Sequence, residues 1–297
     1  MLTEHISPRF VDLDSWSTSD MIAAMYDGQL AACAAVRPAL PAINAAVEDA
    51  VAALKRGGRL VYVGAGTSGR IAVQDGAELR PTYDWPSERV VFVMAGGMQA
   101  VLQSVEGAED DEEKGAGAIA EAEVNEHDVV IAVAASGTTP FTIGALRSAA
   151  ARGAVSIAVA SNRGAPLFEP ARHRILIETG IEVLAGSTRM QAGTAQKIVL
   201  NIFSTAVMVK LGRVYRGLMV NMRASNAKLL HRAVVIVSQI VGCTEDDAAK
   251  FVQRADGDAK IAVLLGLGWE QTEATEALLR HDGNLRSVIN EFAHGRT

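Results

Sequence analysis

Two short segments combine glycines with hydroxyl side chains in a way that suits phosphate binding. The first, Gly64-Ala-Gly-Thr-Ser-Gly-Arg70, follows the apolar run Leu60–Val63, and the second, Ala135-Ser-Gly-Thr-Thr-Pro140, follows the apolar run Val129–Ala134. At the carboxyl edge of a parallel sheet, glycines let the backbone approach a phosphate, and the next helix directs unpaired N–H groups at it. We expect both loops to lie on one such edge and to hold one phosphate group, with candidate contacts from Gly66, Thr67, Ser68, Ser136, Gly137, Thr138 and Thr139.

Each loop also has a simpler interpretation. Gly64-x-Gly66-x-x-Gly69 matches the dinucleotide fingerprint, but that motif needs an acidic residue after the second strand, where this chain reads Val91-Phe-Val-Met-Ala-Gly-Gly97. The glycines could also serve only for tight turns, and the hydroxyls only for capping helices. Two loops of the same kind on one sheet edge favour phosphate binding.

Acidic side chains near these loops are candidates for proton transfer. Glu78 ends the helix expected after the first loop, where it could face the crevice, and Glu182 precedes Gly186-Ser-Thr-Arg189 after the fifth strand. Glu106 and Glu109 follow the second strand, and their spacing of three predicts that they share one helix face. One of them could accept a proton while the other stays solvated.

The sequence predicts no metal site and no cofactor. The six histidines lack a paired metal spacing, and neither a Ser-His-Asp nor a Cys-His arrangement is apparent. Cys33 and Cys243 are far apart in the sequence, so we expect two buried, unpaired thiols.

Five short β-branched runs predict the fold. They are separated by alanine-rich stretches of helical length and comprise Leu60–Val63, Val90–Met94, Val129–Ala134, Val155–Ala160 and Ile175–Ile177. Strands that are apolar on both faces belong to parallel sheets covered by helices. The pattern therefore predicts an α/β protein, a three-layer α/β/α sandwich with a five-stranded parallel sheet.

Helical segments flank the predicted sheet. We expect a helical N-terminal arm over 1–56, a phosphate-binding domain over 57–225, and a helical region over 226–297 whose part from about 240 resembles a three-helix ubiquitin-associated unit. The apolar segment 190–211 is longer than an average helix and apolar around most of its circumference. It predicts a core or interface helix and, with it, a homodimer.

Composition and charge limit the classes of partner that the protein is expected to bind. With 297 residues and 49% hydrophobic side chains the chain can bury a full core, and its net charge of −6 comes without any run of Lys or Arg. This predicts a small-molecule partner rather than nucleic acid or an anionic membrane. Because no apolar run reaches about 18 residues and the N-terminus does not read as a leader, we expect a cytoplasmic protein.

Longer strings resemble the N-acetylmuramic acid 6-phosphate etherase family, whose members contain the sugar isomerase (SIS) phosphosugar-binding domain and are related to glucokinase regulatory proteins. The resemblance covers nearly the whole chain. The strings that carry it are Gly64–Arg70, Val105–Asp110, Ala134–Pro140, Gly186-Ser-Thr-Arg-Met190 with Ala192-Gly-Thr-Ala-Gln-Lys197, and Leu218-Met-Val220 with Asn226-x-Lys228-Leu229.

The resemblance implies a carbon–oxygen lyase that removes D-lactate from N-acetylmuramic acid 6-phosphate and leaves N-acetylglucosamine 6-phosphate, in peptidoglycan recycling, with no cofactor. Two carboxylates suffice for elimination followed by water addition, if burial moves their pKa values toward neutrality. The family's acid falls on Glu78 and its base on Glu109, although the roles could be exchanged between them. Phosphate contacts fall on the two hydroxyl loops, and Glu182 matches a Glu found near the sugar in related domains. Ser187 is a further candidate for substrate binding.

The chain departs from the family pattern in two places. It has Asp75-Gly-Ala-Glu-Leu-Arg-Pro-Thr82 where the family usually reads Asp-Ala-Ser-Glu-Cys-Pro-Pro-Thr, and Tyr26-Asp-Gly-Gln29 where it usually reads Asn-x-Glu-Asp. An Asn expected soon after Thr3-Glu4 is also missing. These changes leave the exact substrate open, and two alternatives share the same pocket: a non-catalytic sugar-phosphate sensor and an aldose–ketose isomerase.

Overall fold

The computed structural model describes residues 1–222 and 227–295, with side chains to residue 291. Asn226, one of the family-like residues, lies outside this part of the chain. The chain forms two compact units, the first made of Met1–Ala77 and Ser87–Ser204 and the second of Glu78–Pro86 and Thr205–Thr297. The division predicted from sequence, at 57 and 226, stays a prediction about domains.

A five-stranded parallel sheet forms the centre of the first unit, as predicted. Its strands are β1 (Leu60–Gly64), β2 (Val90–Met94), β3 (Val129–Val133), β4 (Val155–Ala160) and β5 (His173–Leu176), in the order β2-β1-β3-β4-β5. The last strand begins two residues earlier than expected, because Ile157 pairs with His173 in the ladder. The order reverses at β1, so the crevice between β1 and β3 is the expected ligand position.

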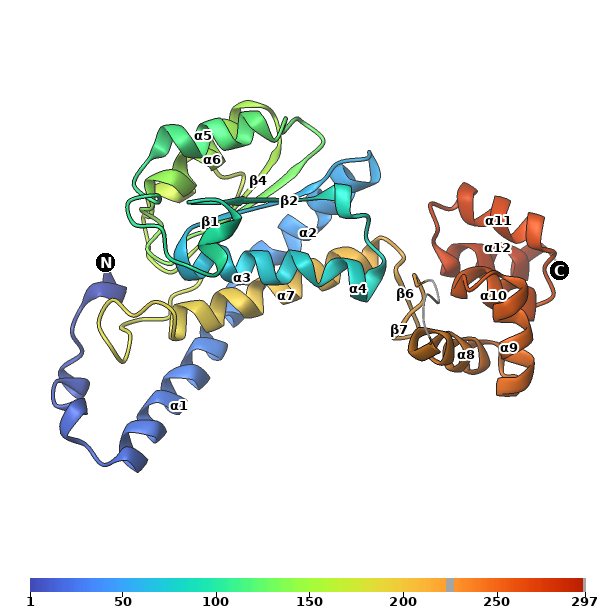
Figure 1. Cartoon of the computed structure of the whole chain (residues 1–297), viewed down its shortest axis with the longest axis horizontal. Helices are drawn as coiled ribbons and strands as arrows, with labels where there is room; N and C mark the ends of the chain where they lie inside the picture. Colours follow the sequence, from blue (N-terminus) through green and yellow to red (C-terminus); the bar gives the residue numbers. More distant parts are fainter. Residues whose placement is uncertain (223–226, 296–297) are drawn as a thin grey trace. The chain divides into compact units, whose positions relative to one another are not determined.

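Helices cover both faces of the sheet, as Figure 1 shows. On one face lie α5 (Glu112–Glu121) and α6 (Pro140–Ala151), and on the other lie α2 (Leu40–Lys55), α3 (Gly66–Ala77) and the start of α7 (Gln191–Lys210). Buried residues that pack between the sheet and α5–α6 include Val61, Val130, Ile119, Phe141 and Leu146. The result is the predicted three-layer sandwich.

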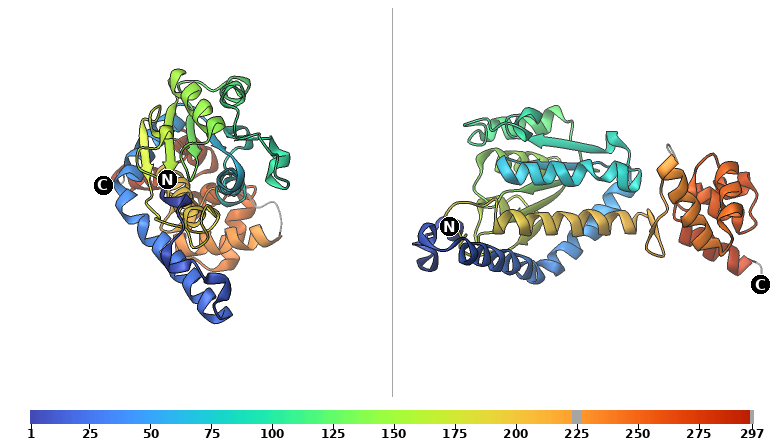
Figure 2. Two further views of the ribbon diagram at one scale, coloured as in Figure 1. Left: turned by 90° about the vertical axis from the view of Figure 1, so that its left-hand side faces the viewer. Right: turned by 60° about the horizontal axis from the view of Figure 1, so that its bottom comes forward.

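The N-terminal arm is helical. Ser17 caps α1 (Thr18–Ala35) by accepting a hydrogen bond from Asp20 N, and α1 extends away from the sheet in the left-hand view of Figure 2. Ala24 and Ala32 are the only buried residues of α1. Cys33, which was expected to be buried, is exposed. Short 3₁₀ turns complete this unit: Leu2–Glu4, Pro8–Phe10, Leu13–Ser15, Arg37–Ala39, Ser87–Arg89, Met98–Val101 and Pro166–Phe168.

The second unit is mainly helical. Its elements are α4 (Leu79–Tyr83), the two-stranded ribbon β6 (Val214–Tyr215) and β7 (Leu218–Met219), and the helices α8 (Ala227–Val241), α9 (Glu245–Arg254), α10 (Ala259–Gly266), α11 (Gln271–Arg280) and α12 (Leu285–Gly295). Thr244 caps α9 through Asp247 N, as its sequence predicts. The likeness to a ubiquitin-associated unit stays a prediction.

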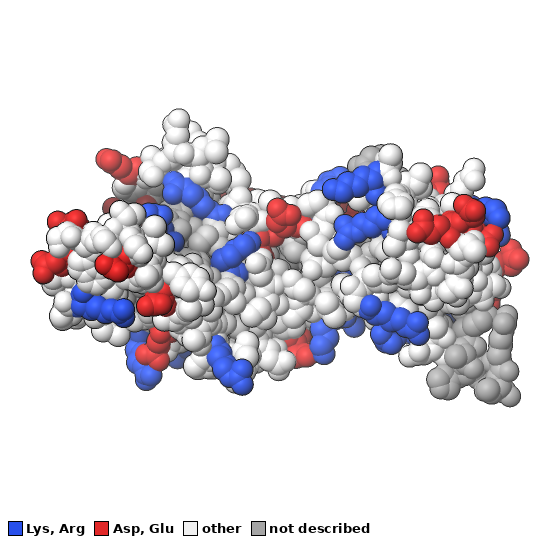
Figure 3. Space-filling view, turned by 90° about the horizontal axis from the view of Figure 1, so that it is seen from below, with Lys and Arg blue, Asp and Glu red and all other residues white. Residues whose placement is uncertain are grey.

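Two helical segments are long and apolar enough to cross a membrane, by length and composition alone. They are Thr18–Lys55 and Gln191–Lys210, and a bent pair of α8 and α9 would make a third if it counted as one span. On the face that Figure 3 shows, Lys and Arg side chains lie among uncharged surface and acidic side chains. The expectation that neither a membrane nor nucleic acid is a partner stays a prediction.

A buried lysine in the second unit has an unusual protonation equilibrium. Lys260 on α10 is 7% exposed, and its Nζ donates a hydrogen bond to the carbonyl of Gly283. Burial lowers the pKa of Lys260 to about 8, and the positive charge of Arg213 acts in the same direction, while Asp258 opposes them.

We expect Lys260→Met to change how stability depends on pH between 8 and 10.5. In this window the folded state has lost the Lys260 proton while the unfolded state keeps it, because lysine ordinarily titrates at 10.5. The free energy of unfolding of the wild type should therefore rise with pH relative to the variant, by roughly 3 kcal/mol. Urea titrations across this range measure the difference, with Lys250→Met, which removes an exposed lysine of the same unit, as control. Identical pH dependence in wild type and Lys260→Met would contradict this prediction.

Candidate functional site

The spacing of the glycines in the first loop follows from the turn between β1 and α3. A Cβ added to Gly64 would lie 2.8 Å from the backbone of Gly69, and one added to Gly69 would lie 2.2 Å from Met94 Sδ. Gly66 has a φ of +51°, which side chains rarely adopt. The strand therefore turns into the helix by close backbone contact, and the loop lies at the carboxyl edge of the sheet.

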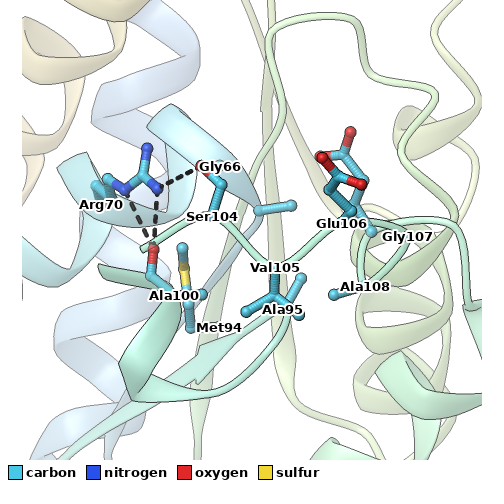
Figure 4. Close-up of a pocket in the computed structure, with 12 residues that line it drawn as sticks. Gly66, Arg70, Met94, Ala95, Ala100, Ser104, Val105, Glu106, Gly107 and Ala108 are labelled. Carbon is cyan, nitrogen blue, oxygen red and sulfur yellow. Dashed lines mark hydrogen bonds between the residues drawn. The ribbon is translucent and has the colours of Figure 1, made fainter. Parts of the chain in front are cut away.

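A pocket of about 340 Å³ opens beside this loop (Figure 4). It lies between the start of α3, the end of β2 and the segment that follows β2. Arg70 lies on one side of it and Glu106 on the other, in the view of Figure 4. Its lining residues are Ala65, Gly66, Arg70, Met94, Ala95, Ala100, Ser104, Val105, Glu106, Gly107, Ala108 and Glu109.

Glu106 and Glu109 both line this pocket. The prediction that they share a helix face is wrong. They lie in the loop before α5, where Gly107 has a φ of +70° and breaks helical geometry. Both side chains are exposed. A Cβ placed on Gly66 would lie 3.9 Å from Glu109 Oε2, so the Glu109 carboxylate lies next to the first glycine loop.

The second hydroxyl loop follows β3, the neighbour of β1 in the sheet. Its Gly137 has a φ of +72°, and a Cβ there would lie 2.4 Å from Ala165 Cβ. Ser136 Oγ accepts a hydrogen bond from Thr138 N at 3.1 Å. Ser136 and Thr139 are half-buried and Thr138 is exposed, and none of the three lines the pocket beside Gly66. The two loops thus share the sheet edge, as predicted, and their joint use by one phosphate stays a prediction.

Asn162, just after β4, holds the second loop in place and was not anticipated. Its Nδ2 donates to the carbonyl of Ala135 at 3.1 Å, and its Oδ1 accepts from Leu2 N at 3.0 Å. Thr3 is fully buried, and its carbonyl accepts from Gly186 N at 2.9 Å. The N-terminal turn therefore ties the second loop to the Gly186 turn. The sequence indicated a role for Asn162 only by its position, just after a strand whose carboxyl end lies at the same edge of the sheet.

Glu182 caps a helix, and its predicted contact with the sugar stays a prediction. Its side chain is fully buried, and its two carboxylate oxygens accept hydrogen bonds from Gln191 N and Ala192 N, both at 2.9 Å. Burial raises the pKa of Glu182, although these two bonds act against it. The carboxylate therefore caps the N-terminus of α7, where the helix dipole favours a negative charge.

Ser187 lies half-buried in the turn that leads into α7. This turn borders the first loop, because a Cβ on Gly193 would lie 3.3 Å from the Thr188 carbonyl and 3.7 Å from Thr67 Cγ2. Thr67 is half-buried and Ser68 is 8% exposed. The structure thus brings Thr67 close to the turn that carries Ser187.

Glu78 begins the second unit and is not among the residues that line the pocket of the first. It is exposed and immediately precedes α4. In the first unit, α3 places Ala77 eleven residues beyond Gly66, which corresponds to roughly 16 Å of helix. Within the first unit, α3 therefore runs from the pocket edge at Gly66 to Ala77.

The arrangement in the first unit suits proton transfer next to a bound anion. Carboxylates of Glu106 and Glu109 stand at a pocket whose other wall includes backbone of a glycine loop at a helix start. Among residues 1–222 and 227–291, no three His, Cys, Asp or Glu side chains gather as metal ligands do.

Comparisons with known proteins show the family of this chain. A profile of the glucokinase regulatory protein N-terminal SIS domain matches residues 42–150, and the SIS domain profile matches residues 112–206. The N-acetylmuramic acid 6-phosphate etherase of Deinococcus radiodurans is 48% identical over 290 residues, which cover 97% of this chain and 95% of that protein. This chain belongs to the N-acetylmuramic acid 6-phosphate etherase family. The etherase of Actinobacillus succinogenes is 43% identical over the same shares of the two chains.

The chain is also similar to a solved structure of the SIS fold. The phosphoheptose isomerase from Francisella tularensis aligns with a TM-score of 0.47 and 20% identity, over 65% of this chain and 100% of that one.

One departure from the etherase pattern has a packing explanation. Gly76 stands where the family usually has Ala, and a Cβ there would lie 2.5 Å from Phe92 Cε1 and 2.9 Å from Tyr62 Cε2. The rings of Tyr62 and Phe92 lie 6.0 Å apart between centroids. In this etherase the Phe92 ring fills the space that an alanine methyl group would need.

Proposed function

We propose that this etherase cleaves the D-lactyl ether of N-acetylmuramic acid 6-phosphate as a carbon–oxygen lyase, giving N-acetylglucosamine 6-phosphate and D-lactate. The observation that carries the proposal is 48% identity to a named etherase over 97% of the chain. The carboxylate of Glu109 beside the Gly66 loop supports it, because the reaction needs a base close to a bound phosphosugar.

The proposed reaction is an elimination followed by an addition. In the open-chain aldehyde, a base removes the C2 proton, the C2–C3 double bond forms, and the C3–O bond breaks as an acid protonates the departing lactate oxygen. Water then adds its hydroxyl to C3 and a proton to C2. We assign the base to Glu109 and the acid to Glu78, and both hydroxyl loops, with Ser187, to the sugar phosphate.

One assay tests this function against its two rivals. Pure protein incubated with N-acetylmuramic acid 6-phosphate should release D-lactate in an amount equal to the N-acetylglucosamine 6-phosphate formed. A sensor would bind the product without releasing lactate, and an isomerase would interconvert an aldose and a ketose phosphate. The match to the glucokinase regulatory protein domain keeps the sensor as a rival. The carboxylates in the pocket favour an enzyme, because a sensor needs no proton transfer.

Ser136→Ala is expected to weaken binding of N-acetylglucosamine 6-phosphate by roughly 1.5–3 kcal/mol, the contribution of one hydrogen bond to a charged group. The reason is that Ser136 lies in the second loop, which contains no lysine to hold the phosphate. Isothermal titration calorimetry measures the affinity. Ser148→Ala is the control, because Ser148 lies on α6, the helix that follows this loop, and donates to Ala116 O in the α5–α6 contact. Equal affinities of wild type and Ser136→Ala would remove Ser136 from the site.

We further propose that the protein is a homodimer. The helix α1 has an exposed apolar row at helical spacing, Ile22, Tyr26 and Leu30, with exposed fractions of 61%, 62% and 51%. Ile202 of α7 is also partly exposed. A second copy of the chain would cover such a row. It would also allow Glu78 of one copy to join Glu109 of the other.

Light scattering after size exclusion should therefore give the mass of two chains at micromolar concentration. Tyr26→Asp should shift the protein toward the monomer, because it places a charge in the covered row. Leu279→Asp is the matched control, since Leu279 is an exposed apolar residue on α11 of the second unit. A wild-type monomer would contradict the proposal.

We also propose a cytoplasmic location. A phosphorylated sugar does not cross a bilayer unaided, so an enzyme that acts on it is expected on the side where the sugar is phosphorylated.

A further inference from the structure

The segment that carries Glu106 and Glu109 has little regular structure of its own. Between the end of β2 and the start of α5 it contains the short turn Met98–Val101 and three glycines with positive φ, at positions 96, 97 and 107. Leu102 is 89% exposed. A segment of this kind keeps a defined position only if neighbouring elements hold it.

At its C-terminal end, backbone contacts with α6 hold the segment. Phe141 N donates to the carbonyl of Glu109 at 3.0 Å. The two helices behind it approach closely through glycines, because a Cβ on Gly115 would lie 2.0 Å from Phe141 O and one on Gly144 would lie 2.1 Å from Glu112 O. This end is therefore fixed to the helix that follows the second hydroxyl loop.

At its N-terminal end, the side chain of Arg70 holds the segment (Figure 4). Arg70 Nε donates to Ala100 O at 3.2 Å and to Val101 O at 3.0 Å. Its Nη2 donates to Ala100 O at 3.0 Å and to Ser104 Oγ at 3.3 Å. Arg70 is the fifth residue of α3 and directly follows Gly69, so this contact starts from the end of the first glycine loop.

We propose that Arg70 is a positioning residue, which holds residues 100–104 so that Glu109 stays at the pocket beside Gly66; this proposal rests on the proposed function. The planar guanidinium offers several donors in a fixed fork, and here two of its nitrogens reach three acceptors. A lysine ammonium on a flexible stem can reach fewer of them. The two hydroxyl loops and the carboxylate segment thus form one connected structure.

A misplaced base slows the chemical step more than it weakens substrate binding. Displacement of a reacting group by about 1 Å can lower turnover by on the order of 10²-fold. Arg70→Met should therefore lower kcat for lactate release by roughly 10–100-fold, with Arg70→Lys in between. Its Kd for N-acetylglucosamine 6-phosphate should stay within about threefold of the wild type.

Arg89 provides a matched control in the same unit. Its Nε donates to Gly58 O at 3.0 Å, and its Nη2 donates to Leu54 O at 2.6 Å, so it also fastens backbone carbonyls. These lie before β1, at the opposite edge of the sheet from the pocket. Arg89→Met should lower the free energy of unfolding and leave kcat unchanged.

Hydrogen–deuterium exchange tests the positioning without any assay of activity. Peptides that cover residues 98–109 should exchange faster in Arg70→Met than in the wild type, and should not change in Arg89→Met. If the wild type releases no lactate while this exchange pattern holds, the proposed function fails and the positioning stands. Equal losses of kcat in Arg70→Met and Arg89→Met would overturn the proposal. A loss of phosphosugar affinity as large as the loss of kcat would also overturn it, since Arg70 would then contact the ligand.

Discussion

Glu109→Gln is expected to lower the turnover of N-acetylmuramic acid 6-phosphate by roughly 10²–10⁴-fold, the range for loss of a general base, or about 3–5 kcal/mol of barrier. Glutamine keeps the shape of the side chain and cannot take the C2 proton. Phosphosugar binding and folding should change little, because Glu109 is exposed and its backbone, not its side chain, holds the loop to α6. Lactate release under saturating substrate measures the effect.

Glu106→Gln is the matched control, because Glu106 lines the same pocket from the same loop. We expect it to keep most of the activity. Exchange of the C2 proton of unreacted substrate into deuterated solvent should be suppressed more in Glu109→Gln than in Glu78→Gln, if Glu109 is the base. If Glu106→Gln loses turnover and Glu109→Gln keeps it, the base is Glu106.

Glu78→Gln should also be slow, and mixing the two inactive variants tests whether the site is shared between subunits. In a mixed dimer, one pocket would combine the intact Glu109 of one copy with the intact Glu78 of the other. Random reassociation should then restore roughly a quarter of the wild-type activity, since about half of the dimers are mixed and one site in each is complete. No recovery from correctly mixed dimers would place both carboxylates in one chain.

Asp75→Ala is expected to have the largest effect on stability, a loss of roughly 3–5 kcal/mol. Asp75 on α3 is 2% exposed and accepts hydrogen bonds from Tyr62 Oη at 2.9 Å, Asn201 Nδ2 at 2.8 Å and Ser204 Oγ at 3.2 Å. These bonds join α3 to β1 and α7. Without the carboxylate, the buried hydroxyls of Tyr62 and Ser204 would lose their acceptor.

Urea unfolding of wild type and Asp75→Ala measures this loss. Asp75→Asn should cost less, because an amide keeps one oxygen for Asn201 and Ser204 and can donate to Tyr62. Burial raises the pKa of Tyr62 well above its usual 10, and the negative charge of Asp75 and its hydrogen bond act in the same direction. The Tyr62 hydroxyl therefore keeps its proton and can donate. A loss below about 1 kcal/mol in Asp75→Ala would mean that water takes the place of the carboxylate.

Local patterns in the sequence were enough to predict the sheet and its ligand edge. The five strands are short runs of β-branched residues bounded by helical stretches, and all five were found in parallel pairing. The first loop was also predictable, because backbone sterics make glycine the residue for a turn in which Gly64 and Gly69 nearly touch. Such features depend on residues that are close in the chain.

The hydrogen bonds and local backbone of single carboxylates were harder to predict. Glu182 stands after a strand on the ligand edge, a place equally suited to a sugar contact and to a helix cap. The Glu182 carboxylate caps α7 by accepting hydrogen bonds from Gln191 N and Ala192 N, so this contact depends on where α7 begins. Glu106 and Glu109 have helical spacing, but Gly107 between them adopts a positive φ once the loop is held at both ends.

Short-range sterics, periodicity and shared strings carry enough information to predict the family, the parallel sheet and the types of side chain available for the chemistry. Which of these side chains meet depends on tertiary packing. Arg70 reaches Ser104 across 34 residues, and Asn162 reaches Leu2 across 160. Such contacts depend on how separate helices and loops pack, and the same local pattern is compatible with several packings.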